Sequence, residues 1–352
     1  MKRYLILEDG TAFSGHGFGA PITATGELAI QTSNFGYQEA ISDPANFGKI
    51  LAFTTPMIGG SGIINAIDYE SIDPSVRGII ANDIAFHISA NPTFQDLNDF
   101  LKEKRIPAIY GVDTRALVQK LKNKQVIKAS IMDTNDAHAF DQIKALVLPK
   151  NKTAQISTTH PYAAPNVGKT VAVIDLGLKH SLLRSLSLRK INSVVLPHNA
   201  SIYDIINLRA DAIVISNGPG RVEEVAPFLK PVFDKFYGKL PILGIGLGFL
   251  AISNFLNLEL LDLIPAYNGS NFPVIEQTNN RIWQTAMNID QLVVPDSLSL
   301  NLSRKYFDLK SDLLAGFSIK NDKVLATAFN PEGSPGNFDA ASIYDQFLNM
   351  ME

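Results

Sequence analysis

Short, wholly apolar segments alternate with longer amphipathic ones from Val171 onward, and this alternation constrains the fold more than any other feature of the sequence. The apolar segments have the length of strands, and the segments between them have the length and spacing of helices. A strand that is apolar on both sides must be covered on both sides, as in a parallel sheet with helices on each face. The sequence therefore predicts a doubly wound α/β domain. Its expected strands are 171–175, 193–196, 212–216 and 242–245, and its expected helices are 178–190, 202–208, 222–237 and 247–256.

The first part of the chain has a different pattern, in which short apolar or alternating runs are separated by Gly, Pro, Asn and Asp. This pattern indicates a strand-rich α+β domain over residues 1–148. Strands are expected at 4–7, 27–32, 50–54, 78–81, 106–110 and 126–132. Helices are expected at 93–104, capped by Thr93, at 114–122, opened by Asp113 and Thr114, and at 136–146.

Residues 149–169 are rich in Pro, Thr, Asn and Ser and have no hydrophobic period. This composition is typical of a linker. The second domain is then expected to cover 170–352. A length of 352 residues also fits two domains.

Composition excludes several classes of function. The 31 Lys and Arg residues are outnumbered by 34 Asp and Glu, so nucleic acid is not an expected partner. No cysteine occurs, which excludes disulfides, thiolate metal sites and cysteine nucleophiles. No cluster of carboxylates and histidines has the spacing of metal ligands, so no metal is expected.

Two segments bear on location. The N-terminal apolar run is too short for a secretory signal, so we expect a cytoplasmic protein. Residues 240–258 are uncharged over 19 positions but contain Pro241, three glycines and two asparagines. A buried strand and helix explain this stretch better than a membrane span.

Ligands of a doubly wound sheet bind at the carboxyl ends of its strands, and three turns there are candidates for a site. Residues 217–220 form a Gly-Pro turn with accessible amides that could bind an oxyanion. Residues 246–248 lead from a strand into a helix, as a nucleophile elbow does, but Gly246 stands where a nucleophile would. Residues 330–336 carry Glu332, which could orient a catalytic base.

Each of these turns also has a simpler interpretation. The first is compatible with an ordinary Gly-Pro turn, and Glu332 with a solvated or capping carboxylate. Gly244, Gly246 and Gly248 could belong to a dinucleotide fingerprint, but Phe249 occupies the position where that pattern needs glycine. Close packing of strand and helix is the alternative.

Taken together, the motifs resemble those of one family, the small, glutamine-hydrolysing subunit of carbamoyl phosphate synthetase. The C-terminal half of that subunit is a class I glutamine amidotransferase domain. The resemblance covers nearly the whole chain. It rests on LEDG (7–10), GYQEAISDP (36–44), PMIGGSG (56–62) and VDTRAL (112–117), and on IDLGLKHSLLR (174–184), SNGPG (216–220), PILGIGLG (241–248) and NPEGSPGNFDA (330–340).

The resemblance implies a catalytic triad that this chain lacks. In the family, an elbow cysteine attacks the glutamine amide, a histidine in the final loop moves the proton, and a glutamate two residues later orients the histidine. The matching positions are Gly246, Asn330 and Glu332, so only the glutamate is retained. All six histidines precede residue 199, and the second half of the domain offers no substitute base.

The glutamine pocket implied by the resemblance is also altered. Leu250 stands where the family has Gln, Ala45 where it often has Ser, and Asp290 and Gln291 where it has Gly and Phe. Arg221 and Val222 replace the usual Asp-Pro. The positions that match the family are Gly218, Gly220, Leu247 and Asn288. Glutamine binding is therefore in doubt.

We therefore expect the small chain of a heterodimeric ligase whose own glutaminase is inactive, so that the complex uses free ammonia. Its partner would be the synthetase large subunit, and ATP and Mg²⁺ would bind there, since this chain has no GxxxxGK[ST] motif and needs no cofactor of its own. The product could serve arginine or pyrimidine biosynthesis. The alternatives are a stand-alone binding or regulatory pseudo-amidotransferase, and a glutaminase that uses Ser216 or Ser270.

Overall fold

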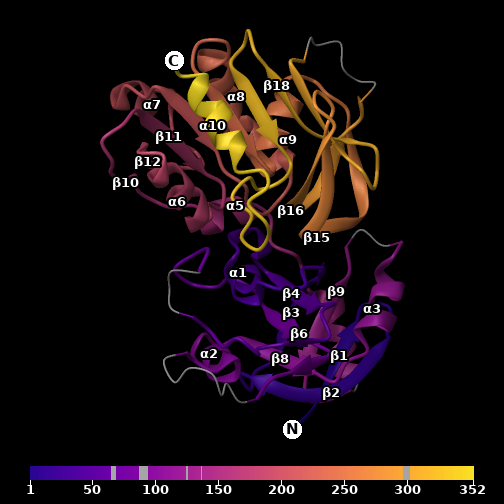
Figure 1. Cartoon of the computed structure of the whole chain (residues 1–352). Coiled ribbons are helices and arrows are strands. Elements are labelled where there is room, and N and C mark those ends of the chain that lie inside the picture. Colours follow the sequence, from indigo (N-terminus) through magenta and orange to yellow (C-terminus); the bar gives the residue numbers. More distant parts are fainter. Residues whose placement is uncertain (65–68, 87–93, 124–125, 136, 296–301) are drawn as a thin grey trace. The chain divides into compact units, whose positions relative to one another are not determined.

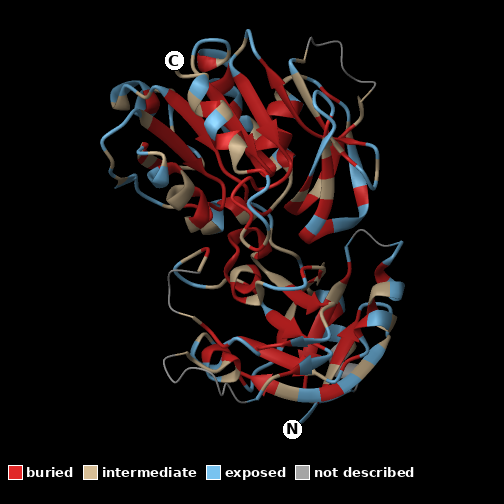
Figure 2. Cartoon of the chain, in the orientation of Figure 1, coloured by how far each residue is buried: buried red, intermediate tan, exposed pale blue. Residues whose placement is uncertain are grey.

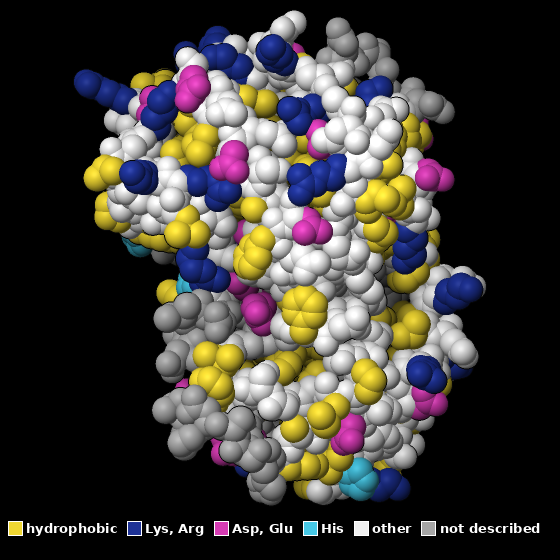
Figure 3. Space-filling model, viewed as in Figure 1, with side chains coloured by type: hydrophobic (Ala, Val, Ile, Leu, Met, Phe, Trp, Pro, Cys, Tyr) yellow, Lys and Arg dark blue, Asp and Glu magenta, His cyan; other side chains and the backbone are white. Residues whose placement is uncertain are grey.

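The computed structural model describes residues 1–64, 69–86, 94–123, 126–135, 137–295 and 302–352. The chain divides into two compact units, Met1–Pro149 and Lys150–Glu352 (Figure 1). Each has its own buried apolar core. On the face drawn in Figure 3, basic and acidic side chains are interspersed, as the nearly balanced composition leads one to expect.

The first unit is built on a closed barrel. The barrel closes because β9 (Lys128–Met132) pairs antiparallel with both β1 (Lys2–Leu7) and β3 (Ala24–Gln31). In barrel order the strands are β1 (Lys2–Leu7), β2 (Ala12–Gly19), β8 (Pro107–Tyr110), β6 (Gly78–Ile80), β4 (Lys49–Phe53), β3 (Ala24–Gln31) and β9 (Lys128–Met132). A two-stranded sheet, β5 (Met57–Ile58) and β7 (Asp83–Ile84), lies outside it. The helices are α1 (Tyr37–Ser42), the 3₁₀ turn η1 (Pro44–Asn46), α2 (Leu97–Glu103), α3 (Thr114–Leu121) and α4 (Ala137–Ala145).

This unit confirms a strand-rich α+β fold and corrects two details. The second helix begins at Leu97 and is capped by Asp96, whose carboxylate accepts from the Asn98 amide at 2.7 Å. It is therefore not capped at Thr93, which lies outside the described residues. Strand β2 was not expected, because its glycines suggest a turn. They are needed in the barrel: a Cβ on Gly15 would lie 2.4 Å from the Tyr110 carbonyl oxygen.

The second unit is a ten-stranded sheet whose centre is parallel, and it confirms the doubly wound prediction. Strands β12, β11, β13, β14 and β19 are parallel neighbours, and the chain runs from β11 first to one side and then to the other. The carboxyl ends at such a reversal form the usual ligand site of this fold. In sheet order the strands are β10 (Tyr162–Ala164), β12 (Asn192–Pro197), β11 (Thr170–Asp175), β13 (Ala212–Ile215), β14 (Ile242–Ile245), β19 (Val324–Thr327), β18 (Leu314–Ile319), β16 (Arg281–Val293), β15 (Leu260–Glu276) and β17 (Arg304–Asp308).

Helices cover both faces of the parallel strands, and the three central strands β13, β14 and β19 are buried along their whole length (Figure 2). Helices α7 (Ile202–Leu208), α8 (Val222–Phe236) and α9 (Leu247–Phe255) pack beside one another on one face. Helices α6 (His180–Leu188) and α10 (Ser342–Asn349) lie on the other face, where Arg189 Nε donates to Asp345 Oδ1 at 2.6 Å. For α6, α7 and α8, which connect parallel strands, this placement follows from right-handed crossovers on either side of β11.

The two strands of the long hairpin, β15 and β16, are not predicted from the sequence. Its pairing register shifts between Asp262 and Tyr267 and again between Gly269 and Phe272. Each shift interrupts the alternation of buried and exposed residues that would reveal a strand.

The prediction that residues 149–169 form a linker is wrong, because the structure shows regular elements there. Helix α5 (Lys152–Ile156) and strand β10 lie within this stretch, and both belong to the second unit. Hydrogen bonds between side chains and backbone groups hold it in place: the Thr153 hydroxyl donates to the Pro219 carbonyl at 2.8 Å, and the Thr158 amide donates to Asp175 Oδ2 at 2.7 Å. A polar sequence can thus be ordered by side-chain–backbone bonds that leave no hydrophobic pattern.

Residues 240–258 form β14, the turn at Gly246 and α9. Across the described ranges, no helix has both the length and the hydrophobicity to cross a bilayer.

The Thr153 bond gives a test of the ordered stretch. We expect Thr153→Val to lower the free energy of unfolding by about 1–2 kcal/mol, because it leaves the Pro219 carbonyl without this donor. Thr153→Ser retains the hydroxyl and should lose less. Urea denaturation measures both, with the exposed Thr278→Ala as control; equal stability of the Val and control variants would contradict the role of the bond.

Candidate functional site

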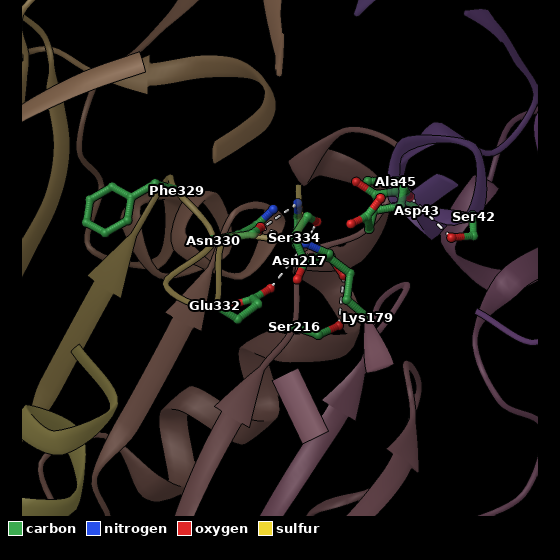
Figure 4. Close-up of polar contacts among 12 residues, drawn as sticks. Ser42, Asp43, Ala45, Lys179, Ser216, Asn217, Phe329, Asn330, Glu332 and Ser334 are labelled. Atoms are coloured by element: carbon green, nitrogen blue, oxygen red, sulfur yellow. Dashed lines mark hydrogen bonds and ion pairs between the residues drawn. The ribbon is translucent and has the colours of Figure 1, made fainter. Parts of the chain in front are cut away.

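Three turns meet at the carboxyl ends of β13, β14 and β19 (Figure 4). Parallel register aligns these strands, with Ile215 paired to Gly244 and Ile245 paired to Thr327. The amide of Gly246 continues the ladder and donates to the Thr327 carbonyl at 2.8 Å. The register therefore places the turns that begin at Asn217, Gly246 and Asn330 side by side.

Gly246 forms the sharp connection between β14 and α9. Its φ of 54° and ψ of −110° lie in a region that favours glycine. Its carbonyl accepts from the Leu250 amide at 3.1 Å, so the helix starts at once. This is the backbone of an elbow without a nucleophilic side chain.

The side chain of Asn217 fills the space beside the elbow. Its Oδ1 accepts from the Gly218 amide at 2.8 Å and from the Leu247 amide at 3.0 Å. Its Nδ2 donates to Asn330 Oδ1 at 3.3 Å. Both asparagines are buried, and Asn330 is itself fixed by its amide, which donates to the Ala286 carbonyl at 2.9 Å. The structure thus joins the three turns through one carboxamide.

Close backbone contacts explain two of the glycines. A Cβ on Gly218 would lie 1.8 Å from the Leu176 carbonyl oxygen, and one on Gly248 would lie 2.3 Å from that of Ile215. Gly218 therefore allows two turns to touch, and Gly248 allows α9 to lie against β13. Strand–helix packing accounts for Gly248 without a dinucleotide.

Glu332 lies in a buried ion pair. Lys179 Nζ is 3.5 Å from Glu332 Oε1, and both side chains are about 2% exposed. The Tyr344 hydroxyl donates to Glu332 Oε2 at 2.7 Å. Lys179 also donates to the carbonyls of Gly333 and Ser334, so it fastens the final loop. The retained carboxylate is held by structural partners (Figure 4).

Three of the altered positions, Arg221, Asp290 and Gln291, lie in one polar cluster centred on Arg221. Its guanidinium is 3.0 Å from Asp262 Oδ1 and 3.6 Å from Asp290 Oδ2. Gln291 Nε2 donates to the same Asp262 oxygen at 2.8 Å. Burial by itself lowers the pKa of Arg221, but the carboxylates of Asp290, Asp262 and Glu223 outweigh it and raise the pKa above its ordinary value.

Other predicted positions lie apart from these contacts. Leu250 is buried within α9, and Asn288 pairs with Asn268 across the hairpin. Gly220 has a φ of 102° and begins the approach to α8. Ala45 belongs to the first unit, where its amide donates to Asp43 Oδ1 at 2.9 Å.

The two serines considered as alternative nucleophiles, Ser216 and Ser270, lie outside the elbow. Ser216 Oγ accepts from the Leu176 amide at 2.9 Å and donates to the Asn217 carbonyl at 2.8 Å, so its hydroxyl fixes the turn. Ser270 is buried on β15. All six histidines of the chain precede residue 199. Across the described ranges, no three or more His, Asp and Glu side chains are grouped to hold a metal ion.

Sequence reasoning missed three residues that organise the site: Asn217, Lys179 and Tyr344. Asn217 lies inside the predicted oxyanion turn, and its position there is the signal that could have identified it. Lys179 follows β11 at the sheet reversal. Tyr344 lies in an ordinary amphipathic helix, and nothing local marks it as a partner of Glu332.

The chain matches two family models. Residues 5–131 match "Carbamoyl-phosphate synthase small chain, CPSase domain" and residues 172–350 match "Glutamine amidotransferase class-I". It is 37% identical to the carbamoyl phosphate synthase small chain of Streptococcus mutans, over 100% of this chain and 97% of that one. The Streptococcus pyogenes small chain is 38% identical and the Lactococcus lactis small chain 36%, each over 100% of this chain and 98% of its own length.

The buried ion pair predicts a large effect on stability. We expect Lys179→Met to lower the free energy of unfolding by about 3–5 kcal/mol, because it removes the cation beside a buried carboxylate. The double variant Lys179→Met with Glu332→Gln should recover part of that loss. Chemical denaturation measures both, and a double variant less stable than Lys179→Met would contradict the pairing.

Proposed function

The chain belongs to the family of carbamoyl phosphate synthase small chains, and from this we propose that it acts as the small subunit of a synthase while hydrolysing no glutamine itself. The complex then takes its nitrogen from free ammonia. The observation that carries the proposal is the elbow: residue 246 is glycine, and the carboxamide of Asn217 lies against it.

Each chemical step of glutamine hydrolysis lacks its group. Gly246 has no side chain to attack an amide, and cysteine is absent from the whole chain. Asn330 stands at the position of the base, but a carboxamide does not take up a proton near neutral pH. Loss of a hydrolase triad costs on the order of 10⁶ in turnover, and this loss supports a silent glutaminase.

The pocket substitutions point the same way. Arg221 and Asp290 both depart from the family pattern, and they face each other in one cluster with Asp262. Charged groups that bind one another are less available to the ammonium and carboxylate of an amino acid. This pairing supports weak glutamine binding or none.

The partner carries the rest of the proposed reaction. We assign ATP and Mg²⁺ to the large subunit, because no GxxxxGK[ST] motif occurs in this chain. The family motifs of the first unit are retained, whereas the losses are concentrated around the glutaminase elbow. This contrast favours a subunit that still assembles over a stand-alone regulator.

The complex can be tested with each nitrogen donor. Co-expressed with its large subunit, the chain should co-elute on size exclusion. The complex should form carbamoyl phosphate from ammonium and bicarbonate but not from glutamine, since no group generates ammonia from the amide.

The large subunit alone is the control. Synthesis from glutamine by the complex above the rate of the large subunit alone would contradict the inactive site. A lone chain at 38.4 kDa that never binds the large subunit would favour the stand-alone regulator.

Restoring the nucleophile alone should not restore activity. We expect Gly246→Cys to release ammonia from glutamine no faster than buffer and to form no glutamyl thioester, because proton transfer and positioning are also missing. The triple variant that adds Asn330→His and Leu250→Gln should release ammonia faster than any of the single variants. Intact-mass analysis and an ammonia assay measure both, with Gly238→Cys as a thiol control; a readily formed thioester in the single variant would overturn this view of the pocket.

A further inference from the structure

We propose that the carboxamide of Asn217 is a built-in occupant of the oxyanion position of the elbow, and that it can lie there because residue 246 has no side chain. The inference rests on the proposed function in taking Gly246 to be the former nucleophile position. It adds that the site is filled by the chain itself, so that the loss of the nucleophile and the closure of the site are one structural change.

The two donors to Asn217 are those an elbow would present to an oxyanion. Such a site uses the amide of the residue after the nucleophile and a second amide from a neighbouring turn. Here these are Leu247, the first residue of α9, and Gly218. Both donate to Asn217 Oδ1, at 3.0 and 2.8 Å, which is the distance range at which an oxyanion is held.

The bonds also fix which atom of the carboxamide is the oxygen. Two N–H groups point at one side-chain atom, so that atom must accept. The Leu247 amide has no acceptor within its own helix, because it lies in the first turn. The Asn217 oxygen therefore caps α9 as well as filling the site.

The geometry excludes this arrangement for any other residue at 246. A Cβ on Gly246 would lie 2.1 Å from Asn217 Oδ1, 2.3 Å from its Cγ and 2.9 Å from its Cβ. The clash involves the branch point and stem of the side chain, so a small rotation does not relieve it. A side chain at 246 and the observed position of Asn217 are mutually exclusive.

The far end of the carboxamide is anchored too. Asn217 Nδ2 donates to Asn330 Oδ1, at the position where the family has its base. Asn330 provides an acceptor there on a backbone fixed to Ala286. The two positions that lost catalytic groups, 246 and 330, thus provide the space and the acceptor for one internal ligand.

A double-mutant cycle on the full chain tests the inference by thermal unfolding. Asn217→Ala should lower the melting temperature by about 5 °C through loss of its hydrogen bonds. Gly246→Ala should lower it further, through backbone strain and displacement of Asn217. The double variant should melt no lower than Gly246→Ala alone, because Asn217 has already been displaced there; a drop equal to the sum of the two would overturn the inference.

A matched control separates displacement from strain. Gly238 also has positive φ, 71°, but a Cβ there would meet only Asp322 Oδ1, at 3.9 Å. The drops caused by Gly238→Ala and Asn217→Ala should therefore add. Coupling of that pair as strong as that of the elbow pair would overturn the inference.

Amide hydrogen exchange provides a second measurement should Gly246→Ala not fold. In Asn217→Ala, the amides of Gly218 and Leu247 should exchange at least about tenfold faster, whereas the Gly246 amide, bonded to Thr327, should keep its rate. Unchanged exchange at Gly218 and Leu247 would refute the occupant. Neither measurement uses glutamine or a partner. A negative result in either would therefore contradict the role of Asn217 without contradicting the proposed function. Conversely, glutamine hydrolysis in the assay above would contradict the proposed function without affecting these measurements.

Discussion

The parallel hydrogen-bond register of β13, β14 and β19 is the constraint on which the rest of the site depends. It brings together turns whose key residues are about 30 and 113 positions apart in the sequence, as the separations of the Asn217 bonds show. Backbone contacts at Gly218 and Gly248 then bring the turns and α9 close enough for one carboxamide to reach all three. The glycines at these positions are therefore as necessary for the arrangement of the site as its polar side chains are.

The sequence predicts the parts of this architecture that depend on local pattern. The parallel strands β11 to β14, the helices α6 to α9 and the glycine between β14 and α9 follow from apolar runs and turn residues. The long hairpin of β15 and β16 and the barrel strand β2 do not, because bulges and closely packed glycines erase the alternation on which prediction relies. The order of residues 149–169 was missed for a related reason: Thr153 and Thr158 are held by side-chain–backbone bonds to distant residues, and β10 pairs antiparallel with the distant strand β12.

The site shows the same division. The resemblance identifies which positions have changed, but it does not reveal what the new residues contact. Arg221 and Asp290 lie on different elements and come together only through the fold, as do Asn217 and Asn330. In both pairs the groups contact each other, so residues at the predicted pocket positions form internal contacts. Such pairing depends on three-dimensional distance and cannot be read from one sequence.

The ion pair of Lys179 and Glu332 has a consequence for how incomplete active sites are judged. A carboxylate that anchors a loop through a buried lysine and a tyrosine is subject to selection for folding, whatever becomes of the chemistry next to it. If the nucleophile and the base are lost, as proposed above, the presence of this glutamate is therefore no record of activity. A buried carboxylate that is needed for folding is therefore weak evidence, taken alone, for catalysis at the position where it stands.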